Sequence, residues 1–215
     1  MNDFFDAVII DVDGTIWNTT GIVSVAWNKA INEWFPDCRK VTALDLQKEF
    51  GKTMEVIAYD LWPELSADER KILMAHCCTE EQIGIKNNQI DISYTGVIET
   101  IKQLSQVINL FVVSNCQKGY IELMLEKTNL QSYIKDFECY GRTGKGKAEN
   151  IMLLSSRNNL HNPLYVGDTL GDYEACKQAG VSFAWASYGF GKVPEANIKL
   201  TQFSDLKSLF SERVI

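Results

Sequence analysis

The chain has 215 residues, of which 46% are hydrophobic, and its formal net charge is −7. This length allows one full domain, or one domain with a sizeable insertion, around a large core. The acidic balance argues against a protein that binds a nucleic-acid polymer, because such a surface needs a basic patch. No stretch reaches the roughly 18 to 20 apolar residues of a membrane-spanning helix.

The cysteine and histidine residues show no pattern of a metal site. The six cysteines include no Cys-x-x-Cys pair, and the two histidines, His76 and His161, stand alone in the sequence. A zinc site or a histidine-centred catalytic triad is therefore not expected. We expect reduced thiols and a cytoplasmic protein, because the residues before the first apolar run lack the pattern of a signal peptide.

A buried β-strand is predicted near the start of the chain. The run Val8-Ile9-Ile10 is apolar and β-branched, which is typical of a strand covered on both faces. Asp11 and Asp13 follow it, and strand alternation predicts that both carboxylates point the same way. Because like charges held close together cost free energy, a divalent cation such as Mg²⁺ is one explanation. The other is that Asp13-Gly14 is an ordinary turn.

From about residue 18 to residue 88 the pattern is helical, with no predicted strand. The spacing of apolar residues and the capping residues predict four helices, at 22–34, 43–50, 53–62 and 66–86. Ser66 and Glu69 form a capping box at the start of the last one. This segment is too long for a simple crossover between neighbouring strands. We interpret residues 18–88 as a helical cap inserted into a core formed by residues 1–17 and 89–215.

Two features of the predicted cap have more than one interpretation. The polar loop Gly51-Lys52-Thr53 is a candidate for reaching over a site, which makes Gly51 and Lys52 substrate-binding candidates, although such a turn is often only a connection. Four tryptophans are interpreted as cap core rather than as a ligand site: Trp17, Trp27, Trp34 and Trp62.

From Ser93 onward, strands and helices alternate. The pattern predicts strands at 108–113, 137–140, 164–166 and 181–185, the last being the final clear strand, and helices at 97–104, 120–127, 148–157 and 173–178. This alternation indicates an α/β fold with a parallel sheet covered by helices. In such sheets, ligands bind beyond the carboxyl ends of the strands.

Polar segments lie where this shared edge is expected. They are Asp11-Val12-Asp13, Ser114-Asn115, the segment Gly167-Asp168-Thr169-Leu170-Gly171-Asp172, and the basic glycine loop 144–147 before a helix. Carboxylates can hold Mg²⁺, a hydroxyl and an amide can donate to phosphate oxygens, and a lysine can offset the remaining charge. Each segment alone has an ordinary explanation. Their coincidence at one edge favours a single site for a phosphorylated ligand.

These segments are similar to the four ordered motifs of the haloacid dehalogenase superfamily. The motifs are Asp11 to Thr15, Ser114-Asn115, Lys147 and Gly167 to Asp172. With its helical insertion, the chain resembles the phosphoglycolate phosphatase-like branch over nearly its whole length. The resemblance implies a Rossmann-like core and an Mg²⁺-dependent phosphatase that hydrolyses phosphoglycolate, a sugar phosphate or a nucleotide through an aspartyl-phosphate.

The resemblance also implies a role for each matching residue. Asp11 would be the nucleophile, and Asp13 would be the acid and then the base. The metal would be held by Asp11, by the backbone carbonyl of Asp13 and by Asp168. The other implied residues are Thr15, Ser114, the backbone at Asn115 and Lys147 around the phosphoryl group, with Asp172 supporting the metal or the lysine from behind.

Two positions depart from the family pattern. Asn18 stands where the family often has an acidic residue, and Ala148 stands where a proline commonly follows the motif lysine. Loop length does not separate Lys145 from Lys147 as the phosphate lysine. We favour Lys147 because it adjoins the N-terminus of a helix, where free amides attract an anion.

Other functions fit part of the pattern. Residues 141–148 nearly form the P-loop of a nucleotide hydrolase, but Ala148 stands where Ser or Thr must ligate Mg²⁺. A phosphosugar mutase would share all four motifs, and a metal-free dehalogenase would have little need for Asp13. A signalling receiver domain would lack the helical insertion, and a non-catalytic binding protein is disfavoured because no core residue is missing. We expect a small phosphorylated metabolite as partner, no membrane, and a monomer or homodimer.

Overall fold

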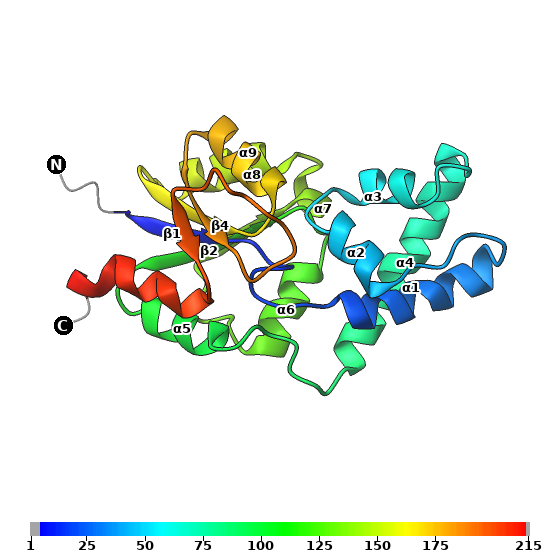
Figure 1. The fold of residues 1–215 in the computed structure, drawn as a ribbon, viewed down its shortest axis with the longest axis horizontal. Coiled ribbons are helices and arrows are strands. Elements are labelled where there is room, and N and C mark those ends of the chain that lie inside the picture. The colour runs from blue at the N-terminus through cyan, green and yellow to red at the C-terminus, as the bar shows by residue number, and fades with distance from the viewer. Residues whose placement is uncertain (1–4, 214–215) are drawn as a thin grey trace.

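A computed structural model describes residues 5–213 of the chain. Its centre is a six-stranded parallel sheet with the strand order β3-β2-β1-β4-β5-β6 (Figure 1). The strands are β1 (Ala7–Ile10), β2 (Asn109–Ser114), β3 (Asp136–Cys139), β4 (Pro163–Gly167), β5 (Ser182–Ala186) and β6 (Ile198–Leu200). Along the chain, β2 and β3 are added on one side of β1, and β4, β5 and β6 are then added on the other side. Ligands bind at such a reversal of strand order.

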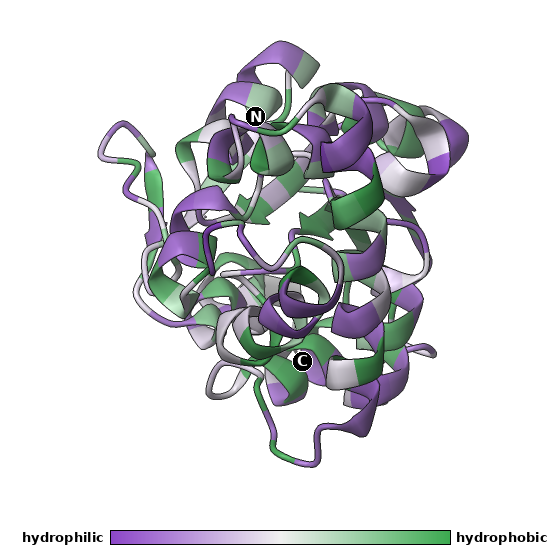
Figure 2. Ribbon diagram, turned by 90° about the vertical axis from the view of Figure 1, so that its right-hand side faces the viewer, coloured by the Kyte–Doolittle hydropathy of each residue, from purple (hydrophilic) through white to green (hydrophobic). Residues whose placement is uncertain are grey.

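Alternate residues of β1 face two separate layers of helices. Val8 and Ile10 belong to a buried cluster with α5 (Val97–Leu104), α6 (Tyr120–Thr128) and the 3₁₀ helix η1 (Phe203–Arg213). Ala7 and Ile9 belong to a second cluster with α8 (Lys147–Arg157) and α9 (Leu170–Ala179). Because side chains alternate across a strand, an apolar run such as this one serves both layers. In Figure 2 the central strands are hydrophobic and the helices around them carry residues of both kinds.

Four helices form a group beside the sheet, on the right in Figure 1. They are α1 (Thr20–Trp34), α2 (Ala43–Glu49), α3 (Met54–Leu61) and α4 (Ala67–Asn87), and we call them the helical block. Capping boxes begin α2 and α4, where Thr42 and Ser66 exchange hydrogen bonds with the third residue of each helix. The rings of Trp27 and Trp62 are fully buried in this block and lie 6.1 Å apart.

The predicted helices and strands are confirmed, with their ends shifted by a few residues. The structure adds β6 and η1 after the last predicted strand, and a short helix, α7 (Tyr140–Thr143), in the basic glycine loop. A strand as short as β6 has too few residues to show a periodic pattern. The boundaries of the cap and core stay a prediction, and residues 1–4 and 214–215 of the predicted core lie outside the described residues.

One local prediction is wrong. Trp34 is not a core residue, because it is the last residue of α1, remains 51% exposed and stacks on His76 with ring centroids 3.7 Å apart. At the acidic tip after β1, Asp11 and Asp13 have different bonding partners, which are described below, but both line the same cleft.

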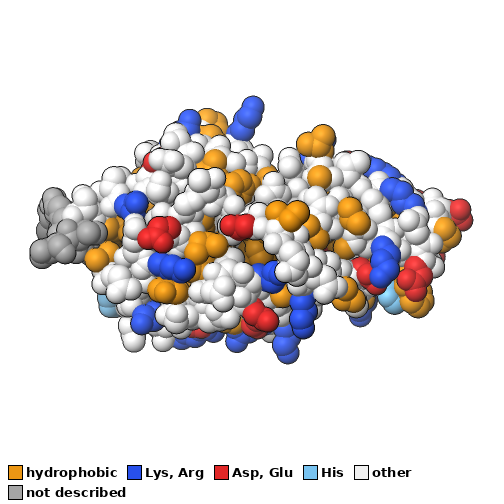
Figure 3. All heavy atoms as spheres, turned by 90° about the horizontal axis from the view of Figure 1, so that it is seen from below, with side chains coloured by type: hydrophobic (Ala, Val, Ile, Leu, Met, Phe, Trp, Pro, Cys, Tyr) orange, Lys and Arg blue, Asp and Glu red, His pale blue; other side chains and the backbone are white. Residues whose placement is uncertain are grey.

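Charged and apolar side chains are mixed on the surface. Among the residues that the structure describes, no helix combines the length and the apolar character needed to cross a bilayer. Figure 3 shows acidic and basic side chains scattered over the face seen from below.

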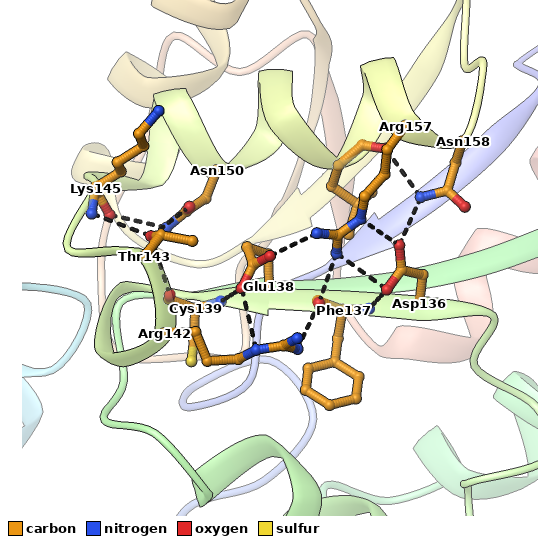
Figure 4. Close-up of polar contacts among 11 residues, drawn as sticks. Asp136, Phe137, Glu138, Cys139, Arg142, Thr143, Lys145, Asn150, Arg157 and Asn158 are labelled. Atoms are coloured by element: carbon orange, nitrogen blue, oxygen red, sulfur yellow. Dashed lines mark hydrogen bonds and ion pairs between the residues drawn. The ribbon is translucent and has the colours of Figure 1, made fainter.

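Helix α8 is fastened to the edge strand β3 by Arg157 (Figure 4). The guanidinium donates to both carboxylate oxygens of Asp136, at 2.6 and 3.0 Å, and to Glu138 at 2.6 Å. It also donates to the carbonyl of Phe137 at 2.9 Å. A bidentate pair fixes orientation as well as distance. Arg157 therefore sets the position of α8, whose first residue is Lys147.

Replacing Arg157 by Met is expected to lower the free energy of unfolding by about 2 kcal/mol, because it leaves the carboxylate of Glu138 largely buried with only its weaker partners, Arg142 and the backbone N–H of Cys139. The Glu138 side chain is 4% exposed, and its other ion pair, with Arg142, spans 3.5 Å. Urea unfolding measures the change. Lys29→Met is the matched control, since Lys29 is 64% exposed in its pair with Glu80 and such pairs contribute at most about 1 kcal/mol. Equal losses in the two variants would contradict this role for Arg157.

Candidate active site

The carboxyl ends of β1, β2 and β4 meet at one edge of the sheet. Asp11 follows β1, Ser114 is the last residue of β2, and Asp168 follows β4. The backbone N–H of Asp11 donates to the carbonyl of Val166 at 2.9 Å. This bond extends the pairing of β1 with β4 and brings the two aspartates together, as their place at the strand ends predicted.

Lys147 is the buried cation of this edge. Its ammonium lies 3.0 Å from the carboxylate of Asp11 and contacts that of Asp172, and its side chain is 4% exposed. Asp172 also accepts hydrogen bonds from the backbone N–H and the hydroxyl of Thr169, at 2.9 and 2.7 Å. The start of α9 therefore fixes Asp172, and Asp172 fixes Lys147.

The basic glycine loop holds Lys147 and Lys145 in different surroundings. The Thr143 hydroxyl donates to the Asn150 side-chain oxygen, and the Asn150 amide donates to the carbonyl of Lys145, both at 2.8 Å. These bonds tie the loop to the first turn of α8. Lys145 is exposed, and its side chain extends away from the network in Figure 4. A helical turn, α7, also stands where a P-loop needs an open glycine loop.

Three buried carboxylates lie close together at this edge of the sheet, and Lys147 forms ion pairs with two of them. Ligand atoms of Asp11, Asp168 and Asp172 all lie within 4.8 Å of one another, and each residue is at most 2% exposed. Asp168 Oδ2 accepts from the N–H of Phe190 at 2.6 Å, while its Oδ1 has no hydrogen-bond partner among the described residues. Three carboxylates and one ammonium leave an excess of negative charge. The donor set therefore fits a divalent cation that prefers oxygen ligands, such as Mg²⁺.

The electrostatics of the site lead to the same conclusion. Burial raises the pKa of Asp11 to about 7, although the charge of Lys147 opposes the rise. Burial, together with the charges of Asp172 and Asp11, raises the pKa of Asp168 well above its usual range. Burial alone would lower the pKa of Lys147, but the charges of Asp11 and Asp172 outweigh it and raise that pKa. A bound cation would favour the ionised form of both aspartates.

Asp13 is held by a different set of groups. Its Oδ1 accepts hydrogen bonds from the Tyr120 hydroxyl at 2.7 Å, the Thr19 hydroxyl at 2.8 Å and the Trp17 indole N–H at 3.1 Å. Burial raises the pKa of Asp13 to about 6, and the three hydrogen bonds limit the rise. Because all three donors occupy one oxygen, they fix the direction of the carboxyl group and leave the other oxygen for a ligand.

A small cleft of about 20 Å³ separates these aspartates from the helical block. A space of this size holds roughly one water molecule. The Asn115 amide donates to the carbonyl of Gly51 at 2.8 Å across the cleft, so the predicted loop does contact the core. The ammonium of Lys52 is instead bound by Glu49 and Asp60, at 2.7 and 2.8 Å. The other residues that line the cleft are Asp11, Asp13, Phe50, Met54, Ile57, Glu81, Ser114, Cys116, Gln117 and Tyr120.

The loop after β5 belongs to the site, although the sequence analysis did not include it. A Cβ on Gly189 would lie 2.4 Å from the Gly14 carbonyl oxygen and from Asp168 Cβ. A Cβ on Gly14, whose φ is 81°, would lie 2.2 Å from Asp168 Oδ2. Both positions need glycine because the backbones press against Asp168. The sequence signal that could have predicted this close backbone contact was the glycine-rich run Gly189-Phe190-Gly191 after the last predicted strand.

Glu81 enters the cleft from α4 and was also missed. It is 3% exposed, and it accepts hydrogen bonds from the Trp27 indole N–H at 2.7 Å and the Gln117 amide at 2.9 Å. Burial raises the pKa of Glu81 to about 7, although these two bonds lower it. The available signal was helical spacing, since Glu81 lies four residues from both Cys77 and Ile85 on the buried face of α4. Glu80 instead pairs with Lys29.

Glu81→Gln is expected to stabilise the protein at pH 8 but not at pH 5. The Glu81 carboxyl titrates at 4.5 in an exposed chain and at about 7 in the fold. Between these values the folded state holds the extra proton, so stability falls as pH rises through the window. At about 1.4 kcal/mol per pKa unit, the loss approaches roughly 3 kcal/mol above pH 7. Glutamine avoids this loss, and the Gln117 amide can turn to present Oε1, which is buried without a hydrogen-bond partner among the described residues.

Urea unfolding of both proteins at pH 5 and pH 8 measures this difference. Glu80→Gln is the control, because it removes the same charge from the same helix at the outer surface. An equal effect of Glu81→Gln at the two pH values would contradict the raised pKa of Glu81.

The chain matches the family model of haloacid dehalogenase-like hydrolases over residues 8–186. It is 25% identical to a phosphoglycolate phosphatase of Aquifex aeolicus over 220 residues, which cover 97% of this chain and 98% of that protein. A second phosphoglycolate phosphatase, from Agrobacterium fabrum, is 28% identical over 132 residues, covering 57% of this chain and 56% of that protein.

Solved structures share the fold at lower identity. The crystal structure of a predicted phosphoglycolate phosphatase from Haemophilus somnus has a TM-score of 0.84 at 19% identity, covering 96% of this chain and 98% of that one. A predicted phosphatase from Clostridium acetobutylicum has a TM-score of 0.84 at 17% identity, covering 98% of this chain and 100% of that one. The matched segment, residues 8–186, contains the site residues Asp11, Lys147 and Asp168. The chain therefore belongs to the haloacid dehalogenase-like hydrolase family.

Proposed function

We propose that this hydrolase is an Mg²⁺-dependent phosphatase that cleaves a small phosphomonoester through an aspartyl-phosphate on Asp11. One observation carries the proposal: the buried Asp11 carboxylate lies 3.0 Å from the Lys147 ammonium, within reach of the Asp168 carboxylate. Phosphoryl transfer depends on such positioning and charge neutralisation. The phosphoglycolate phosphatases among the relatives support this reaction class.

The reaction proceeds in two steps that restore both aspartates. An Asp11 oxygen attacks phosphorus, the bond to the leaving oxygen breaks, and that oxygen takes a proton from Asp13. Asp13, now ionised, then takes a proton from a water molecule that attacks the aspartyl-phosphate, which releases inorganic phosphate and frees Asp11. Tyr120, Thr19 and Trp17 orient Asp13 for both transfers.

The remaining residues bind and orient the phosphoryl group. Asp11, the Asp13 backbone carbonyl and Asp168 would hold Mg²⁺, which when bound neutralises charge on phosphate oxygens. Asp172 positions Lys147. Donors to the phosphate oxygens are Lys147, the Ser114 hydroxyl, the N–H of Asn115 and the Thr15 hydroxyl, which is buried without a hydrogen-bond partner among the described residues.

We assign residues 18–88 as the cap of this enzyme. A cleft of about 20 Å³ is too small for a phosphate ester, so the cap must move to admit one. Gly51 and Lys52 line the cleft from the cap and would contact the leaving group when the cap closes. We place the enzyme in the cytoplasm, because its six cysteines are all free thiols and a reducing compartment preserves them. We also propose that it is a monomer or homodimer.

Phosphate release from a panel of phosphoglycolate, sugar phosphates, a nucleoside monophosphate and ATP tests the proposal. We expect release from at least one monoester, loss of release with a chelator, and a fall in kcat of roughly 10⁴-fold in Asp11→Asn. Asp37→Asn is the matched control, because Asp37 is exposed. Release that is indifferent to Asp11 would refute the mechanism. Transfer of phosphate to a second sugar hydroxyl, without release, would instead identify a mutase.

A matched pair of variants assigns the phosphate lysine. Lys147→Met removes the ammonium beside Asp11 and is expected to lower kcat/KM by roughly 10²-fold or more. Lys145→Met removes an exposed ammonium from the same loop and is expected to leave kcat/KM nearly unchanged. Steady-state kinetics on the best monoester compare the two. A loss confined to Lys145→Met would reverse the assignment.

A further inference from the structure

We propose that Glu81 determines substrate specificity by favouring phosphate esters with an uncharged, hydroxyl-bearing leaving group, such as a polyol or sugar phosphate, over esters whose leaving group carries a carboxylate. This inference rests on the proposed phosphatase function and adds the substrate class to it.

Hydrogen-bond acceptors line the cleft from both sides, Glu81 from the cap and two amide side chains from the core. Glu81 contributes a carboxylate, and the side-chain oxygens of Asn115 and Gln117 are buried without a hydrogen-bond partner among the described residues. The orientation of both amides follows from their donors, because the Asn115 amide binds the carbonyl of Gly51 and the Gln117 amide binds Glu81. A leaving group that enters this space must donate hydrogen bonds to satisfy these oxygens. Hydroxyl groups do so without adding charge.

The cleft lacks an available cation for a second anionic group. Among the described residues that line it, Lys52 is the one basic residue, and its ammonium is bound by two carboxylates at 2.7 and 2.8 Å. Lys147, next to the cleft, is bound by Asp11 and Asp172 and is assigned to the phosphoryl group. A carboxylate on the leaving group would therefore face Glu81 with no compensating charge.

Glu81 cannot easily turn away from such a ligand. Its two oxygens are held by Trp27 from α1 and Gln117 from the core, and the residue is 3% exposed. A fixed like charge disfavours the wrong ligand more strongly than a mobile one, since the repulsion is not relieved by rotation. Specificity through a repulsive group of this kind is a common device.

Two esters of equal length test the proposal. Both esters have a CH2 group next to the ester oxygen. In phosphoglycolate this CH2 carries a carboxylate, and in 2-hydroxyethyl phosphate it carries a hydroxymethyl group. Assays at pH 8 keep Glu81 mostly ionised. We expect kcat/KM for 2-hydroxyethyl phosphate to exceed that for phosphoglycolate by roughly tenfold or more, because like-charge contacts are costly in a desolvated cleft.

The variant Glu81→Gln keeps the shape of the side chain and removes the charge. We expect it to raise kcat/KM for phosphoglycolate by roughly tenfold, mainly through a lower KM. We do not expect it to raise kcat/KM for 2-hydroxyethyl phosphate, whose hydroxyl loses a charged acceptor. Glu80→Gln is the matched control, because Glu80 pairs with Lys29 outside the cleft. It should leave the ratio of the two esters as it is in the unmodified protein.

The outcomes separate this proposal from the function on which it rests. A preference of the unmodified enzyme for phosphoglycolate overturns the proposal while the phosphatase function stands, and this comparison needs no variant. Equal effects of Glu81→Gln on the two esters, or the same effect in Glu80→Gln, also overturn it. Hydrolysis of neither ester nor of any other monoester in the panel would refute the phosphatase function itself.

Discussion

The site depends on the burial of one ammonium, that of Lys147, among three carboxylates. Each aspartate is held from a different element. The backbone N–H of Asp11 binds the Val166 carbonyl of β4, the carboxylate of Asp172 is held by the N-cap of α9, and that of Asp168 by the N–H of Phe190. Lys147 itself is placed by α8, which Arg157 clamps to β3. The negative excess that results is costly in a buried site. A bound cation would offset this excess and keep the aspartates ionised, which links the fold to the proposed metal ion and phosphoryl ligand.

The parallel sheet is what allows such a concentration of charge. Parallel strands all end at the same edge, so residues that follow β1, β2 and β4 become neighbours although they are far apart in the sequence. Strands β1, β2 and β4 are apolar on both faces between their ends, which leaves polar side chains to the ends of these strands. At the start of α9, the backbone N–H groups of Asp168 and Thr169 donate to the carboxylate of Asp172, so this helix end holds an anionic side chain of the site.

Much of this could be predicted because the relevant signals are local. An apolar run followed by Asp11, or a glycine before Asp168, is visible within a few residues. The partners of those residues were harder to predict, because Tyr120, Phe190 and Glu81 reach the site from segments that are distant in the sequence. Glu81 shows the limit most clearly. Its spacing from Cys77 and Ile85 marks the buried face of α4, but only the fold shows that this part of the face lines the cleft.

Glu81 is also the residue at which stability and function oppose each other. Asp11 shares a lysine, whereas the two hydrogen-bond partners of Glu81, Trp27 and Gln117, are neutral. Neutral donors only partly offset the cost of a buried charge, so an ionised Glu81 destabilises the fold near neutral pH. A glutamine would satisfy the same hydrogen bonds without that cost. What glutamine lacks is the uncompensated charge, and the same uncompensated charge is what would repel an anionic leaving group. The destabilisation and the proposed specificity therefore have one physical origin.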